Sequence, residues 1–201
     1  MLVKKIHFLR ILLNYQIKCL KVYFMTTKDF KEETISSKKI YEGKILTLFS
    51  DNVKLPNGRE STRELVLHRG GVTIIAQPNH QNVVLIKQYR YSVKKVLWEL
   101  PAGTLHKDEE PLSSAKRELK EETGYLGNKW ESLGVVYPLP GYSSEVLYFF
   151  RATELIDDEP EPDPDENIEV KVMDLKQAWG MVKDGEIRDA KTIAGISLVM
   201  F

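Results

Sequence analysis

The segment GTLHKDEEPLSSAKRELKEETGY occupies residues 103–125 and carries three glutamates near its end. On a helix that turns by about 100° per residue, Glu118, Glu121 and Glu122 fall within an arc of roughly 100°. Like charges four residues apart destabilise an isolated helix by roughly a few tenths of a kcal/mol. A hard divalent cation bound by oxygen ligands is the natural counter-ion for such a face.

The same segment predicts where this helix begins, ends and packs. Pro111 suits a first turn, where its missing N–H is not needed, and Gly124 can take the left-handed conformation that ends a helix. Ala115 and Leu119 lie on an adjoining stripe that can face a core. Gly103 follows a strand-like segment, so it would let a loop pass close to the helix with its carbonyls turned inward.

The spacing within this segment resembles the Nudix box. Gly103 is followed after five residues by Glu109, and after seven more by Arg117-Glu118-Leu119-Lys120-Glu121-Glu122-Thr123-Gly124-Tyr125. At ~6% usage per residue type, seven fixed positions match by chance at roughly 10⁻⁸ per start site. A solvated acidic helix with lysine pairs is the alternative, but it explains neither Gly103 nor the spacing to Glu109. The resemblance implies an α/β fold: a Nudix-type α/β/α sandwich with a mixed β-sheet, plus N-terminal antiparallel strands.

Composition limits the class of protein. The chain has 201 residues, 42% apolar and 29% charged, which is enough for one domain with a full core. Its net charge is zero, so we expect no nucleic-acid and no membrane partner. The one cysteine, Cys19, excludes an intrachain disulfide and fits a reducing compartment, so we expect a cytoplasmic protein. No apolar run reaches the ~18 residues needed to span a bilayer.

Residues 1–25 differ from the rest, because they carry five lysines and arginines while the first acid is Asp29. Three interpretations stay open: a basic amphipathic membrane-surface or targeting helix, a docking segment, or a poorly ordered extension. We expect a dispensable or poorly ordered extension, with the working protein starting near Met25. Residues 26–70 are then N-terminal strands that serve dimerisation, and residues 71–201 form the Nudix hydrolase domain.

Alternating and apolar runs predict the strands. Residues 38–50 and 62–68 are expected as strands around a turn at 55–58, and residues 71–77 and 83–90 as a hairpin. Further strands are expected at 96–100, 130–138, 145–152 and 168–174.

Two helices and one acidic loop complete the prediction. Asp174 can cap a helix over residues 175–184, and Asp189 a last helix over residues 190–200. Residues 154–169 carry nine acids, three prolines and no basic residue, which predicts an extended, solvated loop. The apolar residues of the last helix that should pack on the sheet are Ile193, Ile196, Leu198 and Val199.

Clustered carboxylates with Mg²⁺, for which Mn²⁺ can substitute, suit the attack of water on a diphosphate. The resemblance implies that the metal ligands are Glu118, Glu121, Glu122 and the carbonyl of Ala102. It also implies that Glu166, in the acidic loop, binds metal or takes a proton from the attacking water. The catalytic residues are thus Glu118, Glu121, Glu122 and Glu166, and the choice of general base between Glu166 and Glu121 stays open. Arg117 is expected to pair with a carboxylate, and Glu109 to orient the loop.

Sequence outside the box resembles the ADP-ribose pyrophosphatase branch of Nudix hydrolases. The matching pieces are Glu99-Leu-Pro-Ala-Gly103, Gln88-Tyr-Arg90, Pro140-Gly141-Tyr-Ser-Ser-Glu145, Asp165-Glu166-Asn-Ile-Glu-Val and Gly185-Glu-Ile-Arg-Asp-Ala-Lys-Thr-Ile. The branch implies hydrolysis of ADP-ribose to AMP and ribose 5-phosphate by a homodimer. It implies that Arg90 contacts the diphosphate, since its planar fork suits phosphate oxygens. The full set of implied substrate-binding residues is Arg63, Glu64, Arg90, Leu105, Pro140, Gly141 and Glu145.

Other functions stay open at this point. Another nucleoside-diphosphate sugar, such as GDP-mannose, is the first alternative, because no residue can be assigned to read the base. A non-catalytic nucleotide-sugar sensor is the second, although the glutamates of the box are intact. For Glu64 and Glu145, exposure at a strand end explains a carboxylate as well as ligand binding does.

Overall fold

The computed structural model describes residues 30–161 and 167–200, which form two compact units. The first unit contains residues 30–40 and 49–64, and the second contains residues 41–48 together with the described residues from 65 onward. The expected extension over residues 1–25 and Glu166 lie outside the described residues. No helix in the described ranges is long and apolar enough to cross a membrane.

Three strands form the N-terminal sheet, in the order β1-β2-β3. They are β1 (Glu33–Glu42), β2 (Leu46–Lys54) and β3 (Glu60–His68). The predicted single strand over residues 38–50 is wrong, because a tight turn closed by the Gly43 N–H and the Leu46 carbonyl, 2.9 Å apart, divides it. In the first unit the chain reverses direction between β2 and β3 at Gly58, whose φ of 82° is left-handed. This agrees with the turn predicted for residues 55–58.

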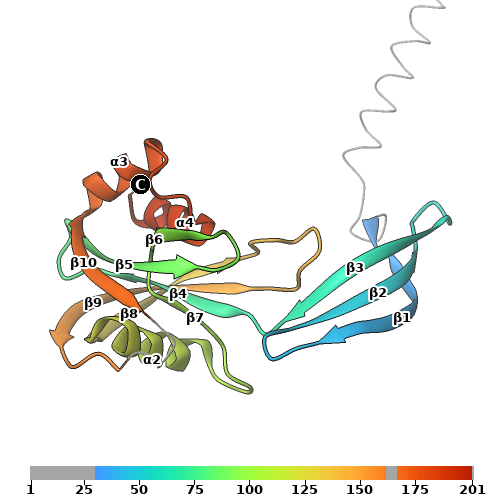
Figure 1. Cartoon of the computed structure of the whole chain (residues 1–201), viewed down its shortest axis with the longest axis horizontal. Helices are drawn as coiled ribbons and strands as arrows, with labels where there is room; N and C mark the ends of the chain where they lie inside the picture. Colours follow the sequence, from blue (N-terminus) through green and yellow to red (C-terminus); the bar gives the residue numbers. More distant parts are fainter. Residues whose placement is uncertain (1–29, 162–166, 201) are drawn as a thin grey trace, which may run out of the picture. The chain divides into compact units, whose positions relative to one another are not determined.

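The second unit contains two further sheets (Figure 1). One is four-stranded and mixed, in the order β7-β4-β9-β8, with β4 parallel to β9 and the other pairs antiparallel. The other is three-stranded and antiparallel, in the order β10-β5-β6. Their strands are β4 (Gly71–Ala76), β5 (Asn82–Arg90), β6 (Lys95–Glu99), β7 (Ala102–Thr104), β8 (Tyr125–Val136), β9 (Leu147–Asp157) and β10 (Ile168–Asp174).

The hairpin predicted for residues 71–77 and 83–90 is wrong. Strand β4 pairs with β7 and β9, whereas β5 pairs with β6 and β10, so the two strands belong to different sheets. Each strand is buried along four or more consecutive residues, and burial on both faces favours a central position with a partner on either edge. Strand β9 also runs to Asp157, so the acidic loop begins later than the composition indicated.

Three helices enclose these sheets: α2 (Pro111–Thr123), α3 (Leu175–Lys183) and α4 (Ala190–Met200). Helix α2 covers one side, and α3 and α4 cover the other (Figure 1). Strand β4 serves both layers, because Val72 and Ile74 pack with Ala115 and Leu119 of α2 while Ile75 packs in the core beneath α3 and α4. The second unit is therefore the expected α/β/α sandwich.

Helix ends follow the local sequence signals. Pro111 stands in the first turn of α2, and Gly124 ends that helix with a left-handed φ of 70°. The Asp174 carboxylate accepts a 3.0 Å hydrogen bond from the Gln177 N–H and caps α3. Asp189 caps α4 in the same way through the Thr192 N–H, at 2.9 Å. Ile196 is buried as predicted, but Leu198 is 47% exposed, because it lies on the outer face of the helix.

Candidate active site

The three glutamates of α2 lie beside strand β7. Glu118 and Glu122 are only 9% and 3% exposed, and the side chain of Glu121 is about one-third exposed at 32%. The Glu122 carboxylate accepts a 2.9 Å hydrogen bond from the Ala102 N–H, which ties the helix to the strand. The helix thus presents carboxylate oxygens next to the Ala102–Gly103 backbone.

Gly103 is the point of closest approach between β7 and α2. A Cβ atom added there would lie 1.9 Å from the carboxyl carbon of Glu118 and 2.0 and 2.4 Å from its oxygens. Any side chain would therefore occupy the space that the Glu118 carboxylate fills. The sequence expectation that this glycine lets the loop pass close to the helix is confirmed.

Arg117 links the carboxylates of the box. Its Nη1 atom donates to Glu118 Oε1 at 2.7 Å and to Glu121 Oε2 at 2.8 Å. Its other nitrogens donate to Glu109 at 3.0 and 3.1 Å, and Glu109 also accepts from the His106 N–H at 2.9 Å. The hydrogen bond from Arg117 lowers the pKa of the Glu109 carboxyl to about 2. Glu109 therefore fixes the loop that precedes α2, and Arg117 supplies the positive charge that offsets the acidic face.

The donor set of this face fits a hard divalent cation. Carboxylates of Glu118, Glu121 and Glu122 and the carbonyl of Ala102 are all oxygen donors, which Mg²⁺ and Mn²⁺ prefer. Across residues 30–161 and 167–200 no three His, Cys, Asp or Glu side chains are already gathered as a metal site. Glu118 and Glu121 each accept from Arg117 through one carboxylate oxygen, Oε1 and Oε2 respectively.

A second ionic network lies at the end of β5 and β6. Glu99 is fully buried, and Arg90 donates to both of its oxygens, from Nε at 2.8 Å and from Nη2 at 2.7 Å. Lys191 of α4 bonds the same carboxylate and lies 3.0 Å from Asp189. Burial disfavours the charge of Glu99, but these cations outweigh it and hold the pKa of its carboxyl below the ordinary value. Arg90 is thereby held in one orientation.

Sequence reasoning missed most of this network. It quoted Glu99 and Lys191 only as parts of matching segments and gave Asp189 only the further role of a helix cap. Lys191 lies 92 residues beyond Glu99 in the chain, so no spacing rule could join them. The sequence did indicate this network through Glu99. A carboxylate within an otherwise apolar strand becomes buried, and a buried charge has to be paired with a cation.

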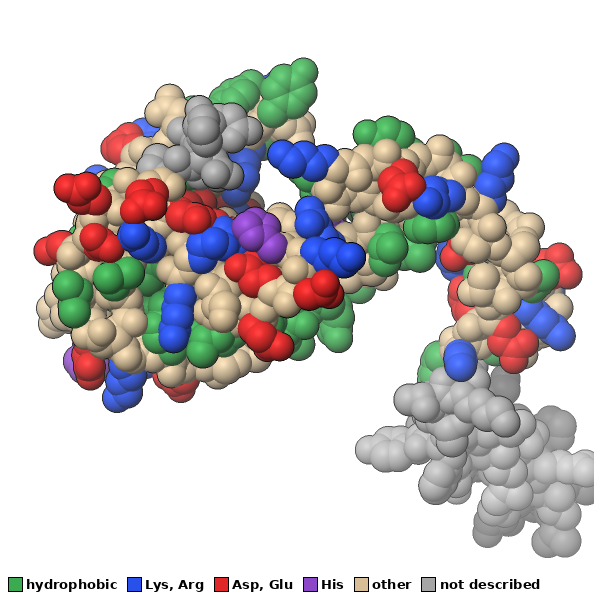
Figure 2. Space-filling view, turned by 90° about the horizontal axis from the view of Figure 1, so that it is seen from below, with side chains coloured by type: hydrophobic (Ala, Val, Ile, Leu, Met, Phe, Trp, Pro, Cys, Tyr) green, Lys and Arg blue, Asp and Glu red, His purple; other side chains and the backbone are tan. Residues whose placement is uncertain are grey.

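A cavity of about 1100 Å³ in the second unit is lined by residues of both networks. Arg117, Glu118 and Glu121 come from the acidic face of α2, and Arg90, Asp189 and Lys191 come from the network around Glu99. Figure 2, which looks onto the side of the molecule that carries α2, shows acidic and basic side chains interspersed on this surface. The cavity exceeds the roughly 300–1,000 Å³ typical of small-molecule sites, so it has room for a nucleotide sugar. Its lining includes the predicted residues Arg90, Ala102, Glu118, Glu121 and Glu145.

The remaining predicted residues lie elsewhere. Leu105 is buried in the apolar core with Ala115, and Glu122 is buried with its carboxylate bonded to the Ala102 N–H. Pro140 and Gly141 are exposed in the turn after β8, where Pro138 and Leu139 line the cavity instead. Arg63 and Glu64 belong to the first unit, where the Arg63 guanidinium pairs with Glu32 at 2.5 Å.

Comparison with known proteins identifies the families to which the chain is similar. The NUDIX domain family matches residues 67–196, and the nucleoside diphosphate sugar hydrolase N-terminal domain matches residues 32–66. An ADP-ribose pyrophosphatase of Bacillus subtilis is 39% identical over 171 residues, covering 84% of this chain and 92% of the relative. A GDP-mannose pyrophosphatase of Yersinia pestis is 37% identical over 145 residues, covering 67% of this chain and 72% of the relative.

A solved structure described as an ADP compounds hydrolase shares the fold. Its TM-score is 0.75 at 21% identity, and the match covers 85% of this chain and 92% of that one. Fold, box and family match together define an enzyme of the diphosphate-hydrolase class, and the chain belongs to the Nudix family. Within that family it is a Nudix hydrolase of the ADP-ribose pyrophosphatase type.

Proposed function

We propose that the enzyme hydrolyses the diphosphate bond of ADP-ribose to give AMP and ribose 5-phosphate, with Mg²⁺ as its metal. The observation that carries this proposal is the carboxylate face of α2 against the Ala102–Gly103 backbone, on the wall of a cavity large enough for a nucleotide sugar. The Bacillus subtilis relative, an ADP-ribose pyrophosphatase that matches most of this chain, supports the choice of substrate.

Glu118, Glu121, Glu122 and the Ala102 carbonyl would hold the divalent cation. When bound there, Mg²⁺ neutralises phosphate oxygens and lowers the pKa of a coordinated water, and Mn²⁺ can substitute. Glu121 is the most exposed of the three glutamates and lines the cavity, so it can take a proton from the attacking water. Glu166 is the other candidate for this base and a further proposed ligand.

Arg90 would bind the diphosphate. Glu99 holds its guanidinium through two hydrogen bonds, so little rotational freedom is lost when a ligand binds. Glu145, on the same cavity wall, is proposed to accept from a ribose hydroxyl. The other proposed substrate contacts, taken from the family pattern, are Arg63, Glu64, Leu105, Pro140 and Gly141.

Another nucleoside-diphosphate sugar is the second candidate substrate. The Yersinia pestis relative named as a GDP-mannose pyrophosphatase favours it, as does the N-terminal family described for nucleoside diphosphate sugars. The chemistry of the box would be the same, and only the pocket for base and sugar would differ.

A substrate panel tests these proposals. ADP-ribose, GDP-mannose, ADP-glucose and NADH are incubated with the enzyme and Mg²⁺, and the products are separated by chromatography. AMP and ribose 5-phosphate from ADP-ribose, at the highest kcat/KM of the panel, support the proposal. Faster turnover of GDP-mannose moves the assignment to the second candidate, and binding of a compound without any turnover refutes hydrolysis.

We also propose a homodimer in which residues 26–70 form the dimerisation strands and residues 71–201 the catalytic domain. Strand β1 is exposed at all ten positions in the single chain, which leaves it open to a partner. Light scattering after size exclusion tests this: a mass of about twice 23.2 kDa supports it, and a monomer contradicts it.

A further inference from the structure

Lys191 places a second, largely buried cation beside Arg90 on the wall of the large cavity. Its side chain is 14% exposed, and its ammonium bonds the Glu99 carboxylate and lies 3.0 Å from Asp189. Asp189 is itself held, because the N–H and the hydroxyl of Thr192 donate to it at 2.9 and 2.6 Å. Two protein carboxylates therefore hold the ammonium of Lys191 in place.

The start of α4 is anchored to the end of β6 at this point. The hydroxyl of Thr192 accepts a 2.8 Å hydrogen bond from the Leu100 N–H, and both residues are fully buried. A Cβ atom added at Gly195, one turn further along α4, would overlap a methyl group of Leu100. Close packing of the two backbones therefore fixes the distance between Lys191 and Glu99.

The formal charges of this network cancel, because Arg90 and Lys191 are cations and Glu99 and Asp189 are anions. Glu99 is fully buried, so water screens its charge weakly. Arg90 directs Nε and Nη2 at Glu99, yet its side chain is 39% exposed and its Nη1 takes no part in that pair. The first turn of α4 stabilises the charge of Asp189 separately, since helix N–H groups favour an anion. The charge of Lys191 is thus available to offset Glu99.

We propose that Lys191 is a positioning residue for diphosphate binding: it neutralises Glu99, so that the positive charge of Arg90 remains available to the substrate. Lys191 has this role only if Arg90 holds the diphosphate, as proposed above. Without Lys191, the diphosphate and the buried Glu99 carboxylate would be two anions that share one guanidinium, and their repulsion would weaken binding. Lys191 acts through Glu99 and needs no contact with the substrate.

Calorimetric titration of the full chain tests this role. ADP-ribose and GDP-mannose are each added in the presence of a chelator, so that neither is hydrolysed and the affinity reports binding alone. For the compound that the wild type binds more tightly, we expect Lys191→Met to weaken binding by roughly tenfold or more. Lys191→Arg keeps the charge and should bind more tightly than Lys191→Met. Equal affinity of these two variants overturns the proposal, and so does binding of neither compound by the wild type.

A double-mutant cycle separates the charge effect from a direct contact with the ligand. In a Glu99→Gln background there is no carboxylate charge to offset, so Lys191→Met should then weaken binding by less than about threefold. The same loss in both backgrounds overturns the proposal, because Lys191 would act without Glu99. Wild-type affinity in Lys191→Met overturns it too, and Lys191→Gln replaces that variant if the apolar side chain prevents folding.

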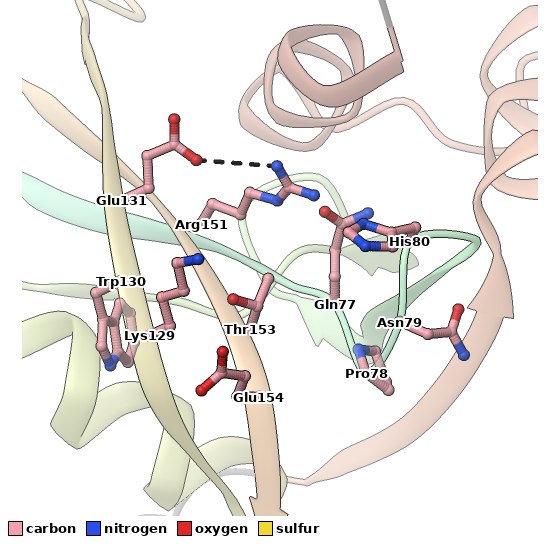
Figure 3. Close-up of a pocket in the computed structure, with 10 residues that line it drawn as sticks. All are labelled: Gln77, Pro78, Asn79, His80, Lys129, Trp130, Glu131, Arg151, Thr153 and Glu154. Atoms are coloured by element: carbon pink, nitrogen blue, oxygen red, sulfur yellow. Dashed lines mark ion pairs between the residues drawn. The ribbon is translucent and has the colours of Figure 1, made fainter.

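The second cavity of this unit, of about 350 Å³, supplies the matched control (Figure 3). Gln77, directly after β4, lines it, whereas Gly71 at the start of that strand lines the first cavity, and six extended residues span roughly 20 Å. Lys129→Met removes an exposed lysine of the second cavity and should leave the affinity unchanged. A wild type that prefers GDP-mannose changes the proposed substrate, while the comparison of the Lys191 variants still decides the role of this residue.

Discussion

Replacing Gly103 by alanine should inactivate the enzyme without unfolding it. The new Cβ atom would lie 1.9 Å from the Glu118 carboxyl carbon, and ordinary contact begins at 3.4 Å, so the carboxylate must move by at least about 1.5 Å. The carboxylate is the end of a flexible side chain, and Gly103 has no left-handed φ, so the fold can accommodate the change. A misplacement of about 1 Å in a catalytic group can cost roughly 100-fold in rate. We therefore expect kcat to fall by about 100-fold or more.

The assay measures kcat and KM for ADP-ribose with Mg²⁺, alongside thermal unfolding. Gly180→Ala is the matched control, because a Cβ at that position meets nothing within 4 Å. That variant should keep wild-type activity and gain slightly in stability, since alanine restricts the unfolded chain. If Gly103→Ala retained kcat within about threefold of the wild type, the geometric argument for Glu118 as a metal ligand would be refuted.

Three further predictions concern the charge network and the helix ends. Glu122→Gln should lower kcat by more than about 100-fold with an unchanged fold by circular dichroism, and near-normal turnover would remove Glu122 from the proposed ligands. The pKa of Glu109 is depressed from 4.5 to about 2, so its contribution to stability is full above pH 4.5 and is lost as the pH falls through 2. Urea unfolding should show Glu109→Gln less stable than the wild type at pH 7, with a gap that narrows below pH 4.5; a gap independent of pH would contradict this. Asp174→Ala should lower the free energy of unfolding by about 1 kcal/mol with normal kcat, and an unchanged urea midpoint would contradict the cap.

Local sequence was sufficient for the features that depend on a few neighbouring residues. The limits of α2, the contact at Gly103 and the caps at Asp174 and Asp189 follow from rules that act within one turn or loop. Strand pairing depends on partners far along the chain, so β4 and β5 read as a hairpin although each completes a different sheet. Their short polar connection fits a hairpin turn and a passage between sheets equally well.

The candidate site shows the same division. Glu118, Glu121 and Glu122 share a helix face, so helix geometry alone brought them together. Glu99 and Lys191 meet only because α4 folds back over β6, which no local pattern encodes. Leu105 is a proposed substrate contact from the family pattern, and its packing with Ala115 in the apolar core depends on the folded arrangement and not on local sequence.

The positive charge of Arg117 compensates carboxylates of the acidic face when no metal ion is bound. Because the guanidinium compensates Glu109, Glu118 and Glu121 when no cation is bound, removing metal leaves no bare cluster of buried negative charge. Purification in a chelator should thus yield an intact, inactive protein that recovers when metal is returned. A cation bound by Glu118 and Glu121 would share their negative charge with Arg117, so we expect the free-metal concentration that supports turnover to depend partly on a residue that binds no metal.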